Sequence, residues 1–198
     1  MSTTIVDLIR HGEPVGGRAI RGNSVDDPLS ALGWNQMRMA VTGYSKWNVI
    51  VSSPLIRCLD FSQELSAKLK IPLHIEQDLK EVGFGSWEGR TKEEIQKDNF
   101  EEYTNFYLDP VNCRPEGAES LSHFFERVVV LYNKMIEKYY GQNILFVTHA
   151  GVIRAIITYT LEAELKSMYR IKVLNAGITR ILHDGKNSIL ERHGFSLV

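Results

Sequence analysis

Short apolar runs alternate with helix-length amphipathic segments along most of this chain. Strand-like runs at 5–9, 48–52 and 73–75 are separated by helical patterns at 30–43 and 54–70. Such alternation is typical of parallel crossover units, in which helices cover both faces of a mostly parallel sheet. We therefore expect an α/β protein of three layers, an α/β/α sandwich.

The second half of the chain extends the pattern. It contains a strongly periodic helix over 121–140, a buried strand at 144–148 and a helix at 150–161. Two further runs, 178–183 and 188–193, flank an Asp-Gly pair that favours a hairpin turn. The mostly parallel sheet is therefore expected to carry an antiparallel edge strand.

The length of 198 residues fits a single domain. Between 82 and 118, glycine and proline residues interrupt two short polar helical patterns. We expect one domain over 1–198, with a partly helical insertion or lid around 82–118.

The charge balance argues against a nucleic-acid or membrane partner. The chain has 23 Lys+Arg and 24 Asp+Glu, a formal net charge of −1, so any anion site must be local. Its two cysteines have no metal-binding spacing, which favours a reducing compartment. The start is charged too early for a signal peptide, and no apolar run approaches the roughly 18 residues of a membrane helix. We expect a cytoplasmic protein, whose oligomeric state the sequence does not indicate.

Two of the predicted strands end in histidine. His11 follows Arg10 after the first strand, and His149 follows the strand at 144–148. Because ligands of open α/β sheets bind at the carboxyl ends of the strands, both imidazoles are expected at this end of the sheet, within reach of Arg57. Each histidine alone has an equally good interpretation as a hydrogen-bonded strand-end residue. Together with two arginines, the pair favours a site for a phosphate dianion.

Four motifs in this order resemble the histidine phosphatase superfamily, in its phosphoglycerate mutase-like branch. They are Leu8-Ile-Arg-His-Gly-Glu13, Ser52-Ser-Pro-Leu-Ile-Arg57, Glu81-Val-Gly-Phe-Gly-Ser-Trp-Glu-Gly89 and Val147-Thr-His-Ala-Gly151. The resemblance spans nearly the whole chain, and four ordered motifs are far more specific than one. It implies a phosphoglycerate mutase-like fold and a phosphatase that acts through a phosphohistidine.

The resemblance also implies catalytic roles. His11 would attack phosphorus, with its second ring nitrogen bonded to a carbonyl of the Gly12 turn. Arg10, Arg57 and His149 would bind the phosphoryl oxygens. Glu81 would give a proton to the leaving group and then activate water.

In this scheme guanidinium and imidazole groups neutralise the phosphate, so we expect no metal and no cofactor. The remaining histidines lack a second ligand at metal spacing and are expected to be surface or core residues: His74, His123, His183 and His193. Glu88 is expected to be structural, as a partner for a backbone amide or an arginine.

Within the branch, the segments 21–30 and 115–120 are most similar to alpha-ribazole phosphatases, which act late in cobalamin assembly. The expected partner is therefore a small phosphomonoester, alpha-ribazole 5′-phosphate. Arg21 and Asn23 lie in the first of these segments and are expected to bind substrate.

The chain departs from the branch at one position. Many members carry a phosphate-contacting asparagine a few residues after the R-H-G-E string, where this chain has Pro14 to Gly17. Asn23 and the backbone N–H groups of Gly16 and Gly17 are the candidates to replace it.

Four aromatic residues recur at helical spacing within the insertion: Phe100, Tyr103, Phe106 and Tyr107. They are interpreted either as the packing face of a short helix or as a lid whose rings stack on a flat heterocycle such as dimethylbenzimidazole.

Other functions remain as alternatives. The first is a broad-specificity phosphatase of small metabolites or sugars in the same branch. A phosphoglycerate mutase is disfavoured because the middle insertion and the C-terminal tail are short. A non-catalytic binder of a phosphorylated partner is disfavoured because every expected catalytic residue is present.

Overall fold

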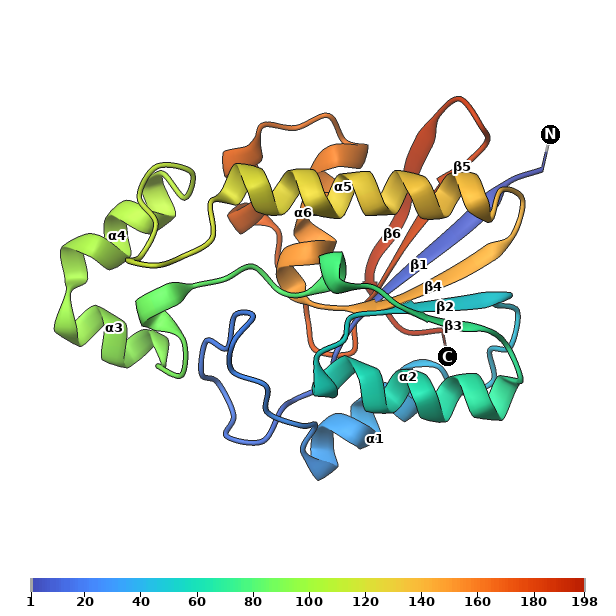
Figure 1. The fold of residues 1–198 in the computed structure, drawn as a ribbon, viewed down its shortest axis with the longest axis horizontal. Coiled ribbons are helices and arrows are strands. Elements are labelled where there is room, and N and C mark those ends of the chain that lie inside the picture. Colours follow the sequence, from blue (N-terminus) through green and yellow to red (C-terminus); the bar gives the residue numbers. More distant parts are fainter. Residues whose placement is uncertain (1, 198) are drawn as a thin grey trace.

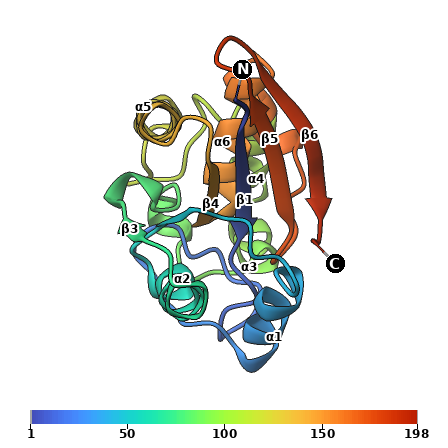
Figure 2. The same cartoon turned by 90° about the vertical axis from the view of Figure 1, so that its right-hand side faces the viewer.

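The computed structural model describes residues 2–197, and its centre is one six-stranded sheet in the order β3-β2-β4-β1-β5-β6 (Figure 1). The strands are β1 Thr4–Arg10, β2 Val49–Ser52, β3 Leu73–Ile75, β4 Asn143–Thr148, β5 Ile178–His183 and β6 Ser188–Phe195. β3, β2, β4 and β1 are mutually parallel, whereas β5 is antiparallel to β1 and β6 to β5. The hairpin of β5 and β6 forms one edge (Figure 2), which confirms the expected sheet.

The helices make the outer layers. They are α1 Ala31–Ala40, α2 Ile56–Leu69, α3 Lys92–Asp98, α4 Phe100–Leu108, α5 Leu121–Lys138 and α6 Ala150–Thr160. Helices α5 and α6 cover one face of the sheet and α1 and α2 the other (Figure 1), so the three-layer prediction is confirmed. No helix among residues 2–197 has the length and apolarity needed to cross a bilayer.

Residues within each central strand alternate between the two layers. In β1, Leu8 packs with the α5 and α6 side while Ile9 packs with the α1 and α2 side. In β4, Phe146 and Val147 divide in the same way. Because both faces are covered, these strands are mostly apolar, with Asp7 of β1 as an exception, which is why they stand out in the sequence.

Helix α1 begins where the sequence predicts, because the hydroxyl of its N-cap Ser30 accepts the backbone N–H of Gly33. Helix α2 was expected to begin at Pro54, but it begins at Ile56, after an extended Leu55. The N–H of Ser53 still bonds to Val147 of β4. The chain therefore continues past the end of β2 before α2 begins. The carboxylate of Asp26 accepts the N–H of Ile56, the first residue of this helix.

The segment 82–118 contains α3, α4 and a 3₁₀ turn at Gly85–Trp87, and it extends beyond the end of the sheet (Figure 1). Its side chains form a small core of their own, with Trp87, Ile95 and Phe106 almost fully buried. This segment therefore lies over the carboxyl ends of β1 and β4.

Candidate active site

The carboxyl ends of β1 and β4 lie side by side and bring two histidines together. Arg10 is in register with Thr148, and the N–H of His11 donates to the Thr148 carbonyl at 2.9 Å. The rings of His11 and His149 are 5.2 Å apart between centroids and meet at 62°. The strand ends therefore juxtapose the two imidazoles that the sequence singles out.

His11 is held in one tautomer. Its Nδ1 lies 2.8 Å from the carbonyl oxygen of Gly12. A carbonyl only accepts hydrogen bonds, so Nδ1 carries the proton and Nε2 keeps its lone pair. The turn requires glycine at position 12, because a Cβ there would overlap the backbone carbonyl of Gly33.

Charge and burial keep His11 neutral. Burial lowers the pKa of His11 well below its ordinary value of 6.5, and the positive charges of Arg10 and Arg57 lower it further. At neutral pH the ring is therefore the unprotonated form, which is the nucleophilic one.

Two guanidinium groups flank His11, and each leaves one buried donor unsatisfied. Arg10 Nη1 donates to the carbonyl of Val173 at 2.7 Å, and Arg57 donates to the carbonyls of Gly22 and Val25 at 2.9 and 3.0 Å. Among residues 2–197, neither Arg10 Nε nor Arg57 Nε has a hydrogen-bond partner. A buried unpaired N–H is costly, so both groups are suited to receive an anion.

His149 lies deeper than His11. It is fully buried, and its Nε2 is 2.7 Å from the hydroxyl oxygen of Ser53. Burial and the nearby charge of Arg57 lower the pKa of His149 well below 6.5, so this ring is also neutral. It lies outside the residues that line the cleft described below, and its expected contact with phosphate stays a prediction.

Glu81 lies at the N-terminus of α6. Its carboxylate accepts the backbone N–H groups of Val82 and Gly151, both at 3.0 Å. A Cβ at position 151 would overlap this carboxylate, which explains the glycine of the V-T-H-A-G string. Glu81 of the third motif is therefore fixed beside the end of β4 by Gly151 of the fourth motif.

A cleft of about 690 Å³ opens over these groups. Arg10, His11, Arg57 and Glu81 line it. Among its lining residues, seven arginines and lysines face three glutamates, and the cations are Arg10, Arg18, Arg21, Arg57, Lys92, Arg154 and Lys172. In a chain with a net charge of −1, this excess makes the cleft a local anion site.

The structure gives Arg21 a role in building the first loop. Its guanidinium donates to the carbonyls of Val15, Gly17 and Ala19 and to the carboxylate of Asp27. Arg21 lines the cleft, but most of its N–H donors are already used, so substrate binding by Arg21 stays a prediction.

Asn23 is not brought together with the other site residues. It lies outside the cleft lining, against Gly83, and its backbone N–H donates to Glu88. Of the two glycines considered as replacements for the branch's asparagine, Gly17 lines the cleft and Gly16 does not.

Glu88 is structural, as expected. Its carboxylate accepts the backbone N–H groups of Asn23, Ser24 and Phe84 and the hydroxyl of Ser24. It therefore ties the first loop to the segment that carries Glu81.

The aromatic residues of α4 differ in packing and in exposure at the cleft. Phe106 is 1% exposed and packs on Trp87 with ring centroids 5.0 Å apart, and Tyr103 stacks on the same tryptophan. Tyr107 is 40% exposed and lines the cleft, as the buried Phe106 also does, whereas Phe100 lies outside it. The packing interpretation therefore holds for Tyr103 and Phe106, and Tyr107 is the accessible ring.

The other histidines have local partners. His74 and His183 bond to the hydroxyls of Tyr139 and Tyr132, His123 to the carboxylate of Glu119, and His193 to the hydroxyl of Thr179 and the carbonyl of Lys172. Within 2–197, no three His, Cys, Asp or Glu residues are grouped so as to hold a metal ion.

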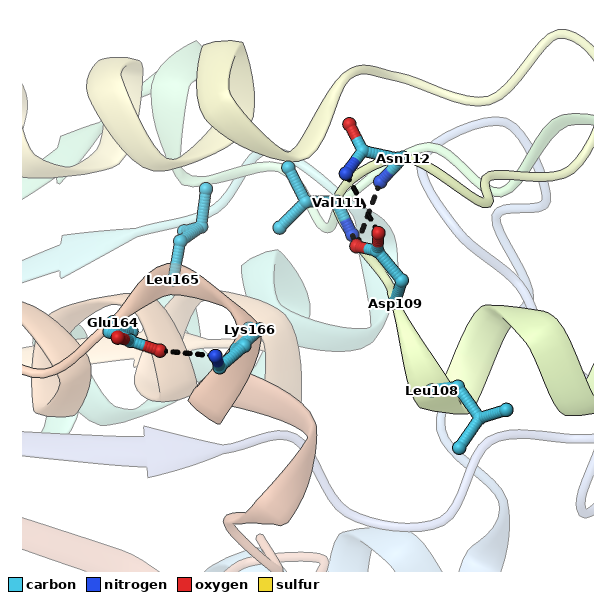
Figure 3. Close-up of a pocket in the computed structure, with 7 residues that line it drawn as sticks. All are labelled: Leu108, Asp109, Val111, Asn112, Glu164, Leu165 and Lys166. Atoms are coloured by element: carbon cyan, nitrogen blue, oxygen red, sulfur yellow. Dashed lines mark hydrogen bonds and ion pairs between the residues drawn. The ribbon is translucent and has the colours of Figure 1, made fainter.

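A second, more open hollow of about 480 Å³ lies between the end of α4 and the 3₁₀ turn at Leu165–Arg170 (Figure 3). Its polar side chains bond to each other, Asp109 to Asn112 and Glu164 to Lys166. It contains none of the strand-end histidines or arginines, and we assign it no role.

Three residues beside the site were missed from the sequence: Ser53, Arg154 and Tyr169. Ser53 stands next to Ser52 in the second motif, and nothing in the motif distinguishes the serine that bonds to His149. Arg154 and Tyr169 line the cleft from α6 and the following 3₁₀ turn, and they carry no sequence signal of their own.

Residues 6–195 match the family model of the histidine phosphatase superfamily (branch 1). The chain belongs to this family. It is 27% identical over 170 residues to the adenosylcobalamin/alpha-ribazole phosphatase of Escherichia coli, covering 84% of this chain and 83% of that protein. It is 26% identical over 188 residues to phosphoserine phosphatase 1 of Hydrogenobacter thermophilus, covering 93% and 89%.

Solved structures of the family share the fold. A phosphoserine phosphatase from Entamoeba histolytica, crystallised with 3-phosphoglyceric acid, superposes with a TM-score of 0.85 at 26% identity and covers 98% of both chains. The expected phosphoglycerate mutase-like fold is confirmed, and the chain is a phosphatase. Its relatives act on different phosphate compounds, so similarity alone leaves the substrate open.

Proposed function

We propose that this phosphatase hydrolyses phosphomonoesters through a phosphohistidine at His11. The observation that carries the proposal is the bond from His11 Nδ1 to Gly12, which leaves Nε2 as an unprotonated nucleophile in a cleft that Arg10 and Arg57, each with an unpaired Nε–H group, also line.

In the first step, His11 Nε2 attacks phosphorus. The N–P bond forms as the bond from phosphorus to the ester oxygen breaks, and the carboxyl group of Glu81 transfers its proton to that oxygen, releasing an alcohol. Arg10 and Arg57 stabilise the charge on the phosphoryl oxygens, with His149 as a further donor. Acid–base help of this kind is worth roughly 10² to 10⁴ in rate.

In the second step, water attacks the phosphohistidine. The carboxylate of Glu81 takes a proton from that water, the N–P bond breaks, and its electrons return to His11 Nε2. Inorganic phosphate leaves, and Glu81 is protonated for the next cycle. The scheme assigns every proton transfer to residues of this chain.

For the substrate, we propose alpha-ribazole 5′-phosphate, which places the enzyme in cobalamin biosynthesis in the cytoplasm. Two observations support this choice. The Escherichia coli relative carries that activity in its name. The cleft also has exposed Tyr107 on its wall, a surface on which a flat heterocycle can stack.

The alternative is a phosphatase of broader specificity for small phosphorylated metabolites. It is favoured by the cations Arg18, Lys92 and Lys172, which line the cleft beyond the phosphate-binding arginines and suit substrates with a second anionic group. The Hydrogenobacter thermophilus relative is named for phosphoserine, which carries such a group.

In either case we propose one domain in which the segment 82–118 acts as a lid. This segment brings Phe84, Trp87, Lys92 and Tyr107 to the cleft, so its position sets the width of the opening.

Phosphate release tests the proposal on a panel of alpha-ribazole 5′-phosphate, phosphoserine, 3-phosphoglycerate and p-nitrophenyl phosphate, with His11→Ala alongside. A dominant kcat/KM on the first substrate, lost in the variant, supports the full proposal. Similar rates on all substrates, still dependent on His11, support the broad phosphatase. Activity that survives His11→Ala overturns the phosphohistidine mechanism.

A further inference from the structure

Glu81 lies in an irregular segment between two 3₁₀ turns, Gln77–Leu79 and Gly85–Trp87. Backbone groups in such a segment need partners from elsewhere. Arg127 of α5 supplies them, because its guanidinium donates to the carbonyls of Asp78, Lys80 and Glu81 at 2.6, 3.1 and 3.3 Å. One side chain thus holds the main chain at Glu81 and at the residues that precede it.

Glu119 completes this arrangement. Its carboxylate accepts two bonds from Arg127, at 2.8 and 2.9 Å, and one from the backbone N–H of Gly83 at 3.1 Å. Arg127 and Glu119 are each 14% exposed, so solvent screens their attraction less than at the surface. We call this ion pair the Arg127–Glu119 clamp.

Arg114 fixes the far end of the segment. It donates to the carbonyls of Gly83 and Glu119 at 3.0 and 3.1 Å, while the N–H of Glu119 donates to the Gly83 carbonyl. The backbone from Asp78 to Gly83 is therefore held by side chains that do not reach the cleft, since neither Arg127, Glu119 nor Arg114 lines it.

We propose that the Arg127–Glu119 clamp positions Glu81 for proton transfer to the leaving group, an inference that rests on the proposed function. The carboxylate of Glu81 accepts the N–H of Gly151 at the N-terminus of α6. This bond by itself would make Glu81 only a cap of that helix. Arg127 of the clamp binds the backbone carbonyl of the same residue. Displacement of a catalytic group by about 1 Å can cost 10²-fold in rate, so this backbone anchor controls the acid step.

Leaving-group dependence tests the clamp. The loss of a well-placed acid slows the hydrolysis of an alkyl phosphate, whose alkoxide needs a proton, much more than that of p-nitrophenyl phosphate, whose phenolate leaves without one. The comparison uses kcat/KM, which covers the steps up to the release of the alcohol and excludes the hydrolysis of the phosphohistidine that both substrates share.

The variants are Arg127→Met, Arg127→Lys and Glu119→Gln, and the substrates are glycerol 3-phosphate and p-nitrophenyl phosphate. For Arg127→Met and Glu119→Gln we expect kcat/KM on glycerol 3-phosphate to fall roughly 10- to 100-fold, and on p-nitrophenyl phosphate less than about threefold. Arg127→Lys keeps the charge and should recover part of the loss.

Arg38→Met is the matched control. Arg38 also makes a two-bond ion pair with a glutamate, Glu64, but both side chains are exposed and lie away from the cleft. This variant should leave kcat/KM unchanged on both substrates. Thermal melts of all variants identify any that unfold at the assay temperature, and Glu119→Gln keeps the test open if Arg127→Met does not fold.

Equal losses on both substrates, or no loss on either, would overturn the clamp. Glu81→Gln separates this failure from a failure of the proposed function. If Glu81→Gln itself shows no leaving-group selectivity, Glu81 is not the acid. If it does and the clamp variants do not, only the clamp is wrong.

Discussion

The Nε2 atom of His149 lies 2.7 Å from the hydroxyl oxygen of Ser53, and both residues are fully buried. The same hydroxyl accepts the backbone N–H of Leu55 at 3.3 Å. Ser53 is therefore fixed from one side and bonds to the imidazole from the other, which ties the end of β2 to the end of β4.

We predict that Ser53→Ala lowers kcat/KM for every phosphomonoester by roughly 2- to 10-fold, the worth of one buried hydrogen bond. Without this bond, His149 loses the partner that sets its orientation next to His11. Steady-state kinetics on two substrates with different leaving groups measure the effect, which should not depend on the leaving group.

Ser62→Ala is the control for this prediction. Ser62 is also fully buried, and its hydroxyl oxygen lies 2.8 Å from both the Ser52 hydroxyl and the Cys58 carbonyl, but it has no hydrogen bond to either histidine. It should lower the melting temperature about as much as Ser53→Ala while leaving kcat/KM unchanged. Equal kinetic losses in the two variants would show that Ser53 acts only through packing.

A second prediction concerns the pKa of His11. Because Arg10 is one of the charges that lower this pKa, Arg10→Gln should raise it. The value should stay below 6.5, since burial is the larger cause and persists in the variant. NMR titration of the imidazole in the substrate-free protein measures both values, with the distant Arg38→Gln as control. An unchanged His11 pKa in Arg10→Gln would contradict the assigned electrostatics.

The histidines also predict how stability depends on pH. Burial lowers the pKa of His11, His149 and His183 in the folded protein, that of His183 to about 4. The unfolded chain binds protons at these residues near pH 6.5 whereas the folded chain does not, so stability is full above 6.5 and falls as the pH drops from 6.5 toward 4. For His183 alone the loss is at most about 3 kcal/mol.

Urea unfolding at a series of pH values between 7.5 and 4 checks this slope. His183→Asn removes one titrating group, so its free energy of unfolding should fall less steeply with decreasing pH than that of the wild type. A lower but parallel curve would mean that His183 contributes only its hydrogen bonds to Tyr132 and Ser188.

The sequence predicted the sheet and the two histidines for a clear physical reason. Strands covered on both faces are mostly apolar, so β1 and β4 stand out despite Asp7 in β1, and the residue after each strand lies at the carboxyl end of the sheet. Pairing of Arg10 with Thr148 then places His11 next to His149.

The parts that could not be predicted depend on side-chain contacts between distant residues. Arg127 binds carbonyls 46 to 49 positions away in the chain, and an arginine in a helix gives no sign of such partners. Arg21 is expected at the substrate because segment 21–30 resembles alpha-ribazole phosphatases, but an arginine in a glycine-rich loop is equally suited to bind backbone carbonyls. Only the folded loop, bridged by Pro14 and Leu29, shows that Arg21 donates to its carbonyls, and the expected contact of Arg21 with substrate stays a prediction.

Helix α4 illustrates the same limit. Its spacing shows an aromatic stripe, but periodicity does not tell which ring faces the protein and which faces the cleft. Docking against Trp87 turns Phe106 inward and leaves Tyr107 accessible at the opening. Of these rings, we therefore expect Tyr107 to stack on the substrate.

We predict that Tyr107→Ala lowers kcat/KM for alpha-ribazole 5′-phosphate roughly tenfold, the low end of what one base stacked on an aromatic side chain contributes. The rate on phosphoserine should change little, because that substrate has no ring to stack. Phe100→Ala is the matched control: Phe100 lies on the same helix, is 68% exposed and does not line the cleft. If Tyr107→Ala lowers both rates equally, Tyr107 does not select an aromatic substrate, and the broad-specificity alternative gains support.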